Sequence, residues 1–595
     1  MHTTQPAYRV LADRLLCRVF LVVAVVLAVL ATMDEFTGRS DDVMRWVAVT
    51  DLLNGQSWFD PYQHRMGLGD GTLMHWSRLV DAPIAALYWV SNLVMPPTDA
   101  LYFTAVAWPT LLAALTLWTI TVTGGVLGGR VGAFSALLVG AFAVKYTAKF
   151  DYFAFDHHGL QVLLFVAALL FFVSRRSRRH AGFWLGACLA LSLSIGAEAL
   201  AHIGVIGAFC ALDWVFRGRA ARHYILQFCA AIVGFFTLTI LVSASRESFF
   251  YPGCDGLTIS VALPATAAAI GLFLAAHLAS TKSIWVRAVC FGVVGASVLW
   301  LAKTYAPFCL QNPIDQMPLA MREFWLSQIT EAQGVTIILQ RHTGETIALI
   351  GMAVFSIVAG IVFAIIADEK TEYALFVTVM LTSLVLFLYQ SRMTAFLAIS
   401  LVVVQAQVLR VIYTRYRTGN QRIYGVLTIV FLVFMSPKTG GSLESYFFSQ
   451  TTSANQVAAD PDLNQVPFTC NTQAEIERLK ALSPGFILAD FDFAGNILRF
   501  TGHSVLGGNY HRNEAGNLAQ IALYRSDVPD VARQLDSLDL DYVIVCKSHP
   551  RADFWTSVSD GAGLPAMFLN GDFPATVEEV DGFDDAAFQV FRVVR

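Results

Sequence analysis

Long apolar runs, separated by short polar or charged stretches, fill the first 436 residues of the chain. A helix needs about 20 mostly apolar residues to cross the hydrocarbon core of a bilayer. On this criterion we expect about thirteen transmembrane helices. The segments are 15–33, 101–124, 130–148, 158–175, 182–199, 201–217, 224–244, 257–279, 284–302, 345–367, 372–390, 393–412 and 421–436. This part of the chain therefore predicts an α-helical polytopic membrane domain.

The segment 82–96 is ambiguous, because it is short and bounded by Pro83 and Pro96. The positive-inside rule decides whether it crosses the membrane. If it does not cross, four basic clusters fall on the cytoplasmic side, and if it crosses, all four fall outside. The clusters are 175–180, 216–223, 281–287 and 410–422. We therefore interpret 82–96 as an interfacial helix, which gives a cytoplasmic N-terminus and an external C-terminus.

The hydropathy pattern changes after residue 436. Short runs such as "FILADF", "YVIVCK" and "FQVFRVV" are typical of strands, and "TQAEIERLKAL" and "DVARQLDSL" are typical of helices. We predict a membrane domain, residues 1–436, with large first and fifth external loops, and an extracytoplasmic α/β domain, residues 437–595. Cys470 and Cys546 lie in the second domain, where an oxidising compartment permits a disulfide, but the sequence does not fix the pairing.

The composition agrees with a membrane protein. Of the 595 residues, 56% are hydrophobic and only 14% are charged, which differs strongly from an ordinary soluble domain. The net charge of −4 argues against a nucleic-acid partner, and the nine cysteines show no C-x-x-C spacing for a zinc knuckle. The first apolar run follows Arg9, Arg14 and Arg18 and has no convincing small-residue cleavage site, so we expect a retained span.

Four polar clusters lie in the predicted external loops, where ionisable groups near membrane depth are functional candidates. They are Asp34, Asp41 and Asp42 in the first loop, Asp151, Asp156, His157 and His158 in the second, Glu331 in the fifth, and Arg392 between two spans. Carboxylates and imidazoles together suit a divalent cation, and oxygen-rich ligation favours Mg²⁺ or Mn²⁺. A cation beside a basic residue suits a substrate that carries phosphate.

Each cluster also has an ordinary structural explanation. Asp41 and Asp42 suit a simple capping role at the start of a helix "DVMRWVAVTDLL", because Ser40 and Asp41 are preferred N-cap types. The segment 156–158 suits a solvated interfacial turn, Glu331 a surface position, and Arg392 a boundary residue whose charged end reaches water. The functional interpretation is favoured because the topology brings all four clusters to one face of one bundle.

Three of these motifs resemble a known family. "RSDDVMRWVAVTDLL" resembles the acidic first-loop motif of the membrane-embedded GT-C glycosyltransferases. "FAFDHHGLQ" resembles the second-loop motif of the oligosaccharyltransferase catalytic subunit, and "SQITEAQ" resembles the Thr-Ile-x-Glu motif in that subunit's fifth external loop. Thirteen spans followed by an external C-terminal domain is also the layout of that subunit.

The resemblance implies roles for individual residues. Asp42 would contact both the metal and the acceptor, with Asp41 beside it. Asp156 and His158 would be metal ligands, with His157 as a substitute. Glu331 would approach the metal from the fifth loop and act with Asp42 in catalysis. Arg392 would bind the phosphate of a polyprenyl-linked donor.

The C-terminal domain departs from the family pattern. It has no Trp-Trp-Asp-Tyr-Gly motif, which reads the acceptor sequon in oligosaccharyltransferases, so an asparagine acceptor is doubtful. In its place stands "TGHSVLGGNYHRNEAGN". His503, His511 and Arg512 in this stretch are additional candidates for the membrane site. The alternative is a connecting loop of a docking domain.

These observations predict a glycosyltransferase that moves a sugar or oligosaccharide from a polyprenyl-(pyro)phosphate lipid to an extracytoplasmic glycan, lipid or protein. Membrane lipids are the other expected partners, and the bacterial inner (cytoplasmic) membrane is the expected location. Two alternatives are a transporter or flippase of lipid-linked sugars, and a non-catalytic scaffold. A transporter predicts repeat symmetry and acids buried mid-span, and only Glu198 is a candidate for such an acid.

Overall fold

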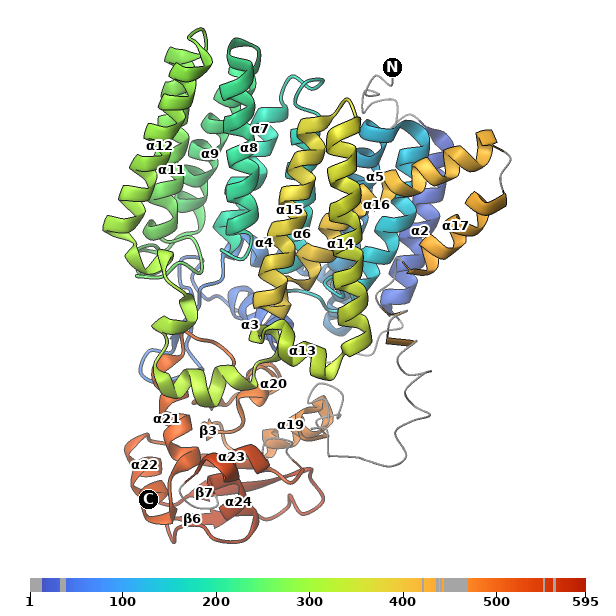
Figure 1. The fold of residues 1–595 in the computed structure, drawn as a ribbon. Helices are drawn as coiled ribbons and strands as arrows, with labels where there is room; N and C mark the ends of the chain where they lie inside the picture. The colour runs from blue at the N-terminus through green and yellow to red at the C-terminus, as the bar shows by residue number, and fades with distance from the viewer. Residues whose placement is uncertain are drawn as a thin grey trace. The chain divides into compact units, whose positions relative to one another are not determined.

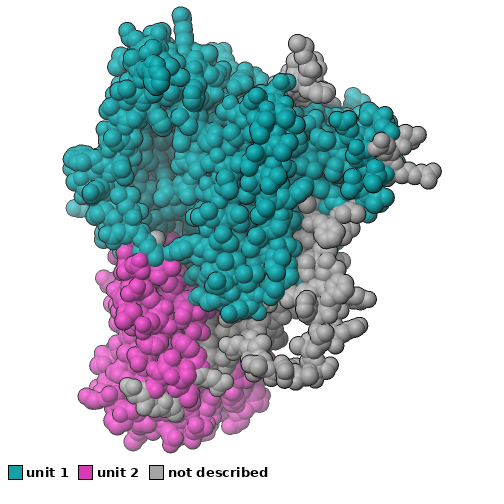
Figure 2. Space-filling view, in the orientation of Figure 1, with its two compact units in different colours: residues 1–36, 76–312, 331–453 teal, residues 37–75, 313–330, 454–595 magenta. Residues whose placement is uncertain are grey.

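The computed structural model describes residues 13–32, 39–419, 422–434, 438, 441–442, 469–548, 552–559 and 563–595. The chain divides into two compact units, coloured separately in Figure 2. Unit 1 comprises residues 1–36, 76–312 and 331–453, and unit 2 comprises residues 37–75, 313–330 and 454–595.

Unit 1 is a bundle of apolar helices, which run side by side in Figure 1. Its main helices are α2 (Arg14–Thr32), α4 (Arg78–Asn92), α5 (Pro97–Tyr146), α6 (His158–Val173), α7 (Ala181–Ile195), α8 (Leu200–Arg217), α9 (Arg222–Ser243), α11 (Ile259–Ala279), α12 (Ile284–Tyr305), α14 (Thr343–Ile366), α15 (Lys370–Tyr389), α16 (Thr394–Gly419) and α17 (Arg422–Phe434). The short helices are α10 (Arg246–Phe249) and α13 (Val335–Arg341). Every segment predicted as a span contains a described helix, which confirms the helical membrane fold.

The number of membrane crossings stays a prediction. Within the described residues, seven helical segments are long and apolar enough to cross a membrane by length and composition. They are 97–146, 200–243, 259–279, 284–305, 343–366, 370–389 and 391–419. The segment predicted to be interfacial forms α4, which contains Pro83. Its 15 residues are fewer than a crossing helix needs.

α5 consists of two helices that meet at Gly129, as the separate predictions 101–124 and 130–148 require. Gly129 has φ +63° and ψ −155°, a conformation that a side chain would strain. The two arms approach closely where glycines face each other. A Cβ atom added to Gly124 would lie 2.7 Å from the carbonyl oxygen of Gly132. Glycine is therefore required both for the turn and for the packing of the arms.

Unit 2 contains a five-stranded mixed sheet in the order β4-β3-β5-β7-β6. The strands are β3 (Phe486–Leu488), β4 (Ser504–Val505), β5 (Tyr542–Cys546), β6 (Val577–Glu579) and β7 (Phe588–Val593). β3 pairs in parallel with β4 and β5, and β7 pairs antiparallel with β5 and β6. The helices are α19 (Gln473–Arg478), α20 (Ala494–Phe500), α21 (Glu514–Arg525), α22 (Val528–Ser537), α23 (Ala552–Val558) and α24 (Leu564–Leu569). The predicted α/β composition is confirmed.

Part of the first loop also belongs to unit 2. α3 (Ser40–Leu53) packs on α20, and the hydroxyl of Tyr510 donates to the Ser40 carbonyl oxygen at 3.0 Å. The guanidinium of Arg65 donates to the Leu498 carbonyl oxygen at 2.8 Å. The hairpin of β1 (Tyr62–Gln63) and β2 (Thr72–Leu73) lies in the same segment. The unit is thus built from segments far apart in the sequence.

A segment of the fifth loop completes the core of unit 2. Met321 and Trp325 are buried in one apolar cluster with residues of the C-terminal segment, among them Leu488 and Val543. The predicted boundary at residues 436 and 437 lies outside the described residues. Dividing the chain into two domains at that boundary would assign residues 37–75 and 313–330 to the membrane domain. In the structure these segments belong instead to the same unit as residues 469–595.

Two disulfides are present. Cys470 and Cys546 are bonded within unit 2, with 5.8 Å between their Cα atoms. Cys254 and Cys309 are bonded within unit 1, with 5.6 Å between their Cα atoms, and they join the connection after α9 to the start of the fifth loop. The second bond has no counterpart among the sequence predictions, because its two cysteines lie in different loops.

Candidate functional site

The Asp-His-His motif of unit 1 sits at the N-terminal end of α6. The connection before it is held by two buried rings, Phe153 and Phe155, whose centres are 4.5 Å apart. The backbone N–H of Phe153 donates to the Ala105 carbonyl oxygen at 2.9 Å, although Phe153 has φ +64°, a strained conformation for an aromatic residue. Such strain persists only where the surroundings determine the conformation, so the connection is held firmly next to the motif.

The three side chains of the motif are buried and in mutual contact. The Asp156 Oδ1 atom accepts from the His157 backbone N–H at 2.7 Å and lies 2.5 Å from His157 Nδ1. Asp156 Oδ2 contacts His158 Nδ1. The two imidazole rings stack, with centres 4.4 Å apart. Asp156, His157 and His158 each offer a ligand atom, and these atoms lie within 4.8 Å of one another.

Glu198, in the connection between α7 and α8, completes this cluster. Its Oε1 atom lies 3.1 Å from His157 Nε2, and its Oε2 atom accepts from Gln161 Nε2, also at 3.1 Å. Gln161 Nε2 donates to the Gly196 carbonyl oxygen as well. Both ring nitrogens of His157 therefore lie beside carboxylate oxygens.

The electrostatics follow from this arrangement. Burial alone would raise the pKa of the Asp156 carboxyl, but the imidazole of His157, and to a smaller extent that of His158, lowers it well below its usual range. Burial alone would lower the pKa of His157, but the carboxylates of Asp156 and Glu198 raise it to about 10. Opposite charges thus outweigh desolvation at Asp156 and at His157.

Glu331 and Arg392 belong to the same electrostatic environment in unit 1. The ammonium of Lys149 lies 3.7 Å from Glu331 Oε1 and lowers the pKa of the Glu331 carboxyl well below its usual value. The charges of His158 and Arg392 lower it further, whereas that of Asp156 raises it. The backbone N–H of Ser391, next to Arg392, donates to the carbonyl oxygen of Gln333, so the two loops are joined directly.

The donor atoms of unit 1 fit a divalent cation. Among the described residues, the buried Nε2 atom of His158 has no hydrogen-bond partner. The Nε atom of Arg392 is likewise buried and unpartnered within the described part of the chain. Buried polar atoms are nearly always satisfied, so an orphaned nitrogen beside a carboxylate indicates a ligand position. Imidazole and carboxylate suit Mn²⁺ and Zn²⁺, and carboxylate oxygens suit Mg²⁺.

The first-loop acids lie in unit 2, in the first turn of α3. Asp42 is buried, with 6% of its surface exposed, and Asp41 is partly buried. The predicted convergence of Asp42 with the residues of unit 1 stays a prediction. Acidic residues in a first turn also stabilise the helix by interacting with its dipole. The N-cap position is Arg39, however, and not Ser40 or Asp41 as the capping explanation expects.

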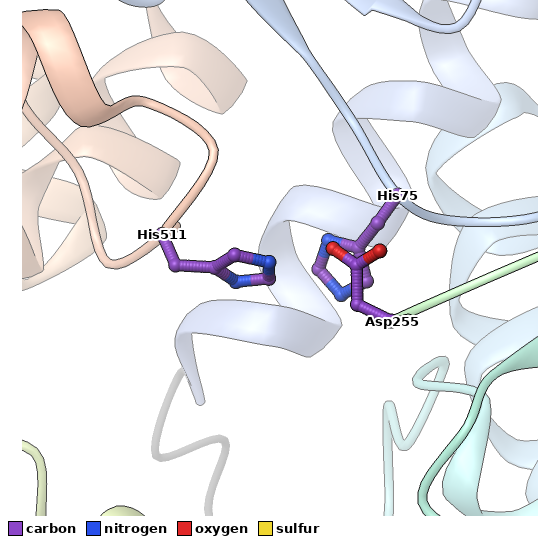
Figure 3. A group of neighbouring side chains, drawn as sticks. All are labelled: His75, Asp255 and His511. Atoms are coloured by element: carbon purple, nitrogen blue, oxygen red, sulfur yellow. The ribbon is translucent and has the colours of Figure 1, made fainter. Parts of the chain in front are cut away.

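The three C-terminal candidates differ in their surroundings. His503 is buried with both ring nitrogens engaged, since Nδ1 accepts from the Gly485 N–H and Nε2 donates to the Leu479 carbonyl oxygen, each at 3.0 Å. These bonds favour a structural role that holds β3 and β4 in place. His511 pairs with His75 of the same unit, with ring centres 4.8 Å apart (Figure 3). Asp255, also labelled in Figure 3, belongs to unit 1. For Arg512 a binding role stays a prediction.

Comparisons with known proteins give similarity in structure alone. No protein-family model matches the chain, and no curated protein matches its sequence. The crystal structure of the Archaeoglobus fulgidus oligosaccharyltransferase in the apo form matches with a TM-score of 0.61 at 13% identity, covering 89% of this chain and 69% of that one. The chain has the fold of a GT-C membrane glycosyltransferase.

Two further structures of this archaeal protein share the GT-C fold with the chain. AglB from Archaeoglobus fulgidus, in complex with an inhibitory peptide and a dolichol-phosphate, matches with a TM-score of 0.60 at 12% identity over 89% of this chain and 69% of that one. The structure of the archaeal enzyme with zinc and sulfate matches with a TM-score of 0.55 at 13% identity over 91% and 70%. The predicted fold and its resemblance to the oligosaccharyltransferase subunit are thereby confirmed.

Sequence reasoning missed two groups of the candidate site in unit 1. Lys149 stands seven residues before Asp156, and nothing in the sequence distinguishes it from any other loop cation. Glu198 was noted only as an intramembrane acid, and its partner His157 lies 41 residues earlier in the chain. The one signal in the sequence is that Glu198 lies inside an otherwise apolar stretch, where an acid needs a buried partner.

Proposed function

We propose that the chain is a membrane glycosyltransferase that transfers a sugar from a polyprenyl-phosphate or polyprenyl-pyrophosphate donor to an extracytoplasmic acceptor. One observation carries the proposal. The Asp156–His158 pair offers an unpartnered buried nitrogen, and the charges of Asp156, His158 and Arg392 all act on the Glu331 carboxyl of the same unit within a GT-C fold. Carboxylates, an imidazole and a guanidinium whose charges act on one another suit a cation together with a phosphate.

The proposed metal ligands in unit 1 are Asp156, His158 and Glu331, and the resemblance adds Asp42 to them. The residues fit a divalent cation, which when bound would offset the negative charge that develops on the leaving phosphate. Lys149 holds Glu331 ionised, because its ammonium stabilises the charged carboxylate. His157 is the weaker ligand candidate, since a carboxylate oxygen lies within 3.1 Å of each of its ring nitrogens.

The donor phosphate is proposed to bind Arg392. A guanidinium presents several N–H donors in a plane and matches the oxygens of a phosphate. The Nε atom of Arg392 has no hydrogen-bond partner among the described residues, so it keeps donor capacity for such a ligand. Retaining this charge beside the leaving group favours the transition state, in which the negative charge on the phosphate increases.

Asp42 is proposed to orient the acceptor and to take its proton. A carboxylate within hydrogen-bond reach of a hydroxyl acts as a general base. The absence of the Trp-Trp-Asp-Tyr-Gly motif favours a hydroxyl of a glycan or lipid over an asparagine.

The orientation of the chain rests on two independent features. The basic clusters are proposed to face the cytoplasm. The Cys254–Cys309 bond joins two loops, and the Cys470–Cys546 bond lies in the C-terminal segment. Both are proposed to face the external side, where an oxidising compartment stabilises such bonds. The transporter alternative depended on Glu198 as an intramembrane acid, and that residue instead pairs with His157 beside the candidate site.

The test is sugar transfer by the full-length protein in proteoliposomes. Radiolabelled polyprenyl-phosphate and polyprenyl-pyrophosphate sugars serve as donors, and cell-envelope extract of the source cells serves as acceptor. We expect label to move from the lipid fraction into polymer or lipid acceptor, and Asp42→Asn to reduce this transfer at least about 100-fold, because removing a charge-stabilising or proton-accepting group typically costs that much. Asp70→Asn, at an exposed acid of the same loop, is the matched control. Transfer that is unchanged in Asp42→Asn, or no transfer from any donor, would contradict the proposal.

A further inference from the structure

The contacts around His157 form one continuous chain of hydrogen-bonded groups. The α7–α8 connection carries Glu198, whose two carboxylate oxygens bind different partners, His157 and Gln161. His157 in turn contacts Asp156 twice, through its backbone N–H and through Nδ1. His157 and Gln161 are buried, with 3% and 0% of their surfaces exposed, and Glu198 is partly buried, with 14% of its side chain exposed.

This series of hydrogen bonds leaves the Asp156 side chain little freedom to rotate. Its Oδ1 atom is held by His157, and its Oδ2 atom faces the His158 ring. If Glu198 is removed, His157 Nε2 becomes a buried polar atom without a partner, which costs about 1–3 kcal/mol. The ring can avoid this cost by turning away, and it then no longer holds Asp156.

We infer that Glu198 is a positioning residue that fixes the His157 ring and, through it, the Asp156 carboxylate and the His158 ring as a preformed site for a divalent cation. The inference rests on the proposed function and deepens it. The carboxylate that binds a histidine next to a metal ligand commonly sets the geometry of the ligand, although it does not touch the metal. Gln161 supports Glu198 from α6 and ties the α7–α8 connection to the same helix that begins with His158.

The glycine of the α7–α8 connection supplies an independent way to move Glu198. Gly196 has extended backbone dihedrals that any residue adopts, but a Cβ atom there would meet the Oε2 atom of Glu198. The variant Gly196→Ala keeps every polar group of the site and mainly displaces the end of the Glu198 side chain, while Gln161 Nε2, 3.1 Å from the added Cβ atom, has to shift slightly. The variant therefore tests whether the position of the Glu198 carboxylate matters while the carboxylate itself is still present.

The experiment measures Mn²⁺ affinity of the purified full-length protein by electron paramagnetic resonance. We expect Glu198→Ala to weaken Mn²⁺ binding about 10–100-fold, the typical cost of losing an outer-shell partner. Glu198→Gln, which keeps an acceptor oxygen, should recover part of the affinity, and Gly196→Ala should weaken binding without removing the carboxylate. Glu247→Ala, at an exposed acid on α10, is the control and should bind as the wild type does.

Thermal unfolding checks that each variant is folded, and Glu198→Gln keeps the test valid if Glu198→Ala is not. If the wild type binds Mn²⁺ and loses it in Asp156→Ala, but Glu198→Ala and Glu198→Gln both bind as tightly as the wild type, this inference is wrong and the proposed function stands. If the wild type binds no Mn²⁺, or Asp156→Ala binds it equally well, the proposed metal site and this inference fall together. An affinity that drops in Glu198→Ala and is partly restored in Glu198→Gln supports the inference.

Discussion

Two adjacent histidines in unit 1 have different chemical surroundings. His157 has a carboxylate beside each ring nitrogen, whereas His158 contacts Asp156 through Nδ1 and keeps Nε2 unpartnered among the described residues. A nitrogen that already binds a carboxylate is a poorer ligand than a free one. The geometry therefore favours His158 as the ligand and His157 as the residue that holds Asp156.

The two histidines should respond differently to mutation. We expect His158→Ala to abolish detectable Mn²⁺ binding, because it removes a ligand. His157→Gln, whose amide donates to one carboxylate, should weaken binding about 10–100-fold, as loss of an outer-shell contact does. Isothermal titration of Mn²⁺ into the purified variants measures both. Tighter binding by His158→Ala than by His157→Gln would reverse the assignment.

The sequence predicted these residues through their types and their position before an apolar run, but not their contacts. That Asp156, His158, Glu331 and Arg392 form one site stays a prediction, which the action of the other three charges on the Glu331 carboxyl supports. The role of Glu198 was not predictable, because a hydrogen bond across 41 residues leaves no local pattern.

At the level of elements, a buried ion-pair cluster links three helices of unit 1. The Arg175 guanidinium at the end of α6 lies 3.0 Å from Asp213 Oδ1 on α8 and 2.6 Å from Glu372 Oε1 on α15. Its side chain is fully buried and also lies over the Phe172 ring. Charges without solvent require such partners, so the cluster specifies how these helices meet.

Removing the central cation should destabilise unit 1. Arg175→Ala leaves Asp213 and Glu372 buried without their main partner, and we expect a loss of about 3–5 kcal/mol of unfolding free energy. The exposed neighbour provides the control Arg176→Ala, which should change little. Fluorescence-monitored thermal unfolding in detergent compares the two, and an equal melting temperature for both variants would refute the assigned role of the cluster.

Hydropathy predicted the helices well, because lipid imposes an apolar run of nearly fixed length on each crossing segment. The break in α5 was also predictable, since the apolar runs 101–124 and 130–148 are separated by glycines. The cluster around Arg175 was not, because in the sequence Arg175 belongs to a basic stretch that reads as a cytoplasmic loop.

At the scale of the whole molecule, the linear order of the chain does not match its packing. The segments 37–75 and 313–330 are external loops by hydropathy, yet each forms part of the core of unit 2. A composition change marks where the C-terminal segment begins, but it carries no information on which loops pack against that segment. Such long-range packing depends on shape and is not visible in local periodicity.

Sidedness is the global property that the sequence predicts and that labelling tests. Replacing the five cysteines outside the disulfides, Cys17, Cys188, Cys210, Cys229 and Cys290, leaves the four disulfide-bonded ones in place. In that background we expect Ser537→Cys to react with an impermeant maleimide on intact spheroplasts and Arg179→Cys to react only after permeabilisation. Both positions are exposed. Labelling of Arg179→Cys before permeabilisation would invert the topology.

The central claim is that the Asp-His-His motif holds a cation next to the phosphate of a lipid-linked sugar. An electron cryo-microscopy structure of the full chain with Mn²⁺ and a polyprenyl phosphate tests it most directly. We predict density for one ion in contact with Asp156 and with Nε2 of His158, at about 2.0–2.6 Å from the ligand atoms, and density for the phosphate beside Arg392. A phosphate bound away from Arg392, with no ion at Asp156 and His158, would contradict the account.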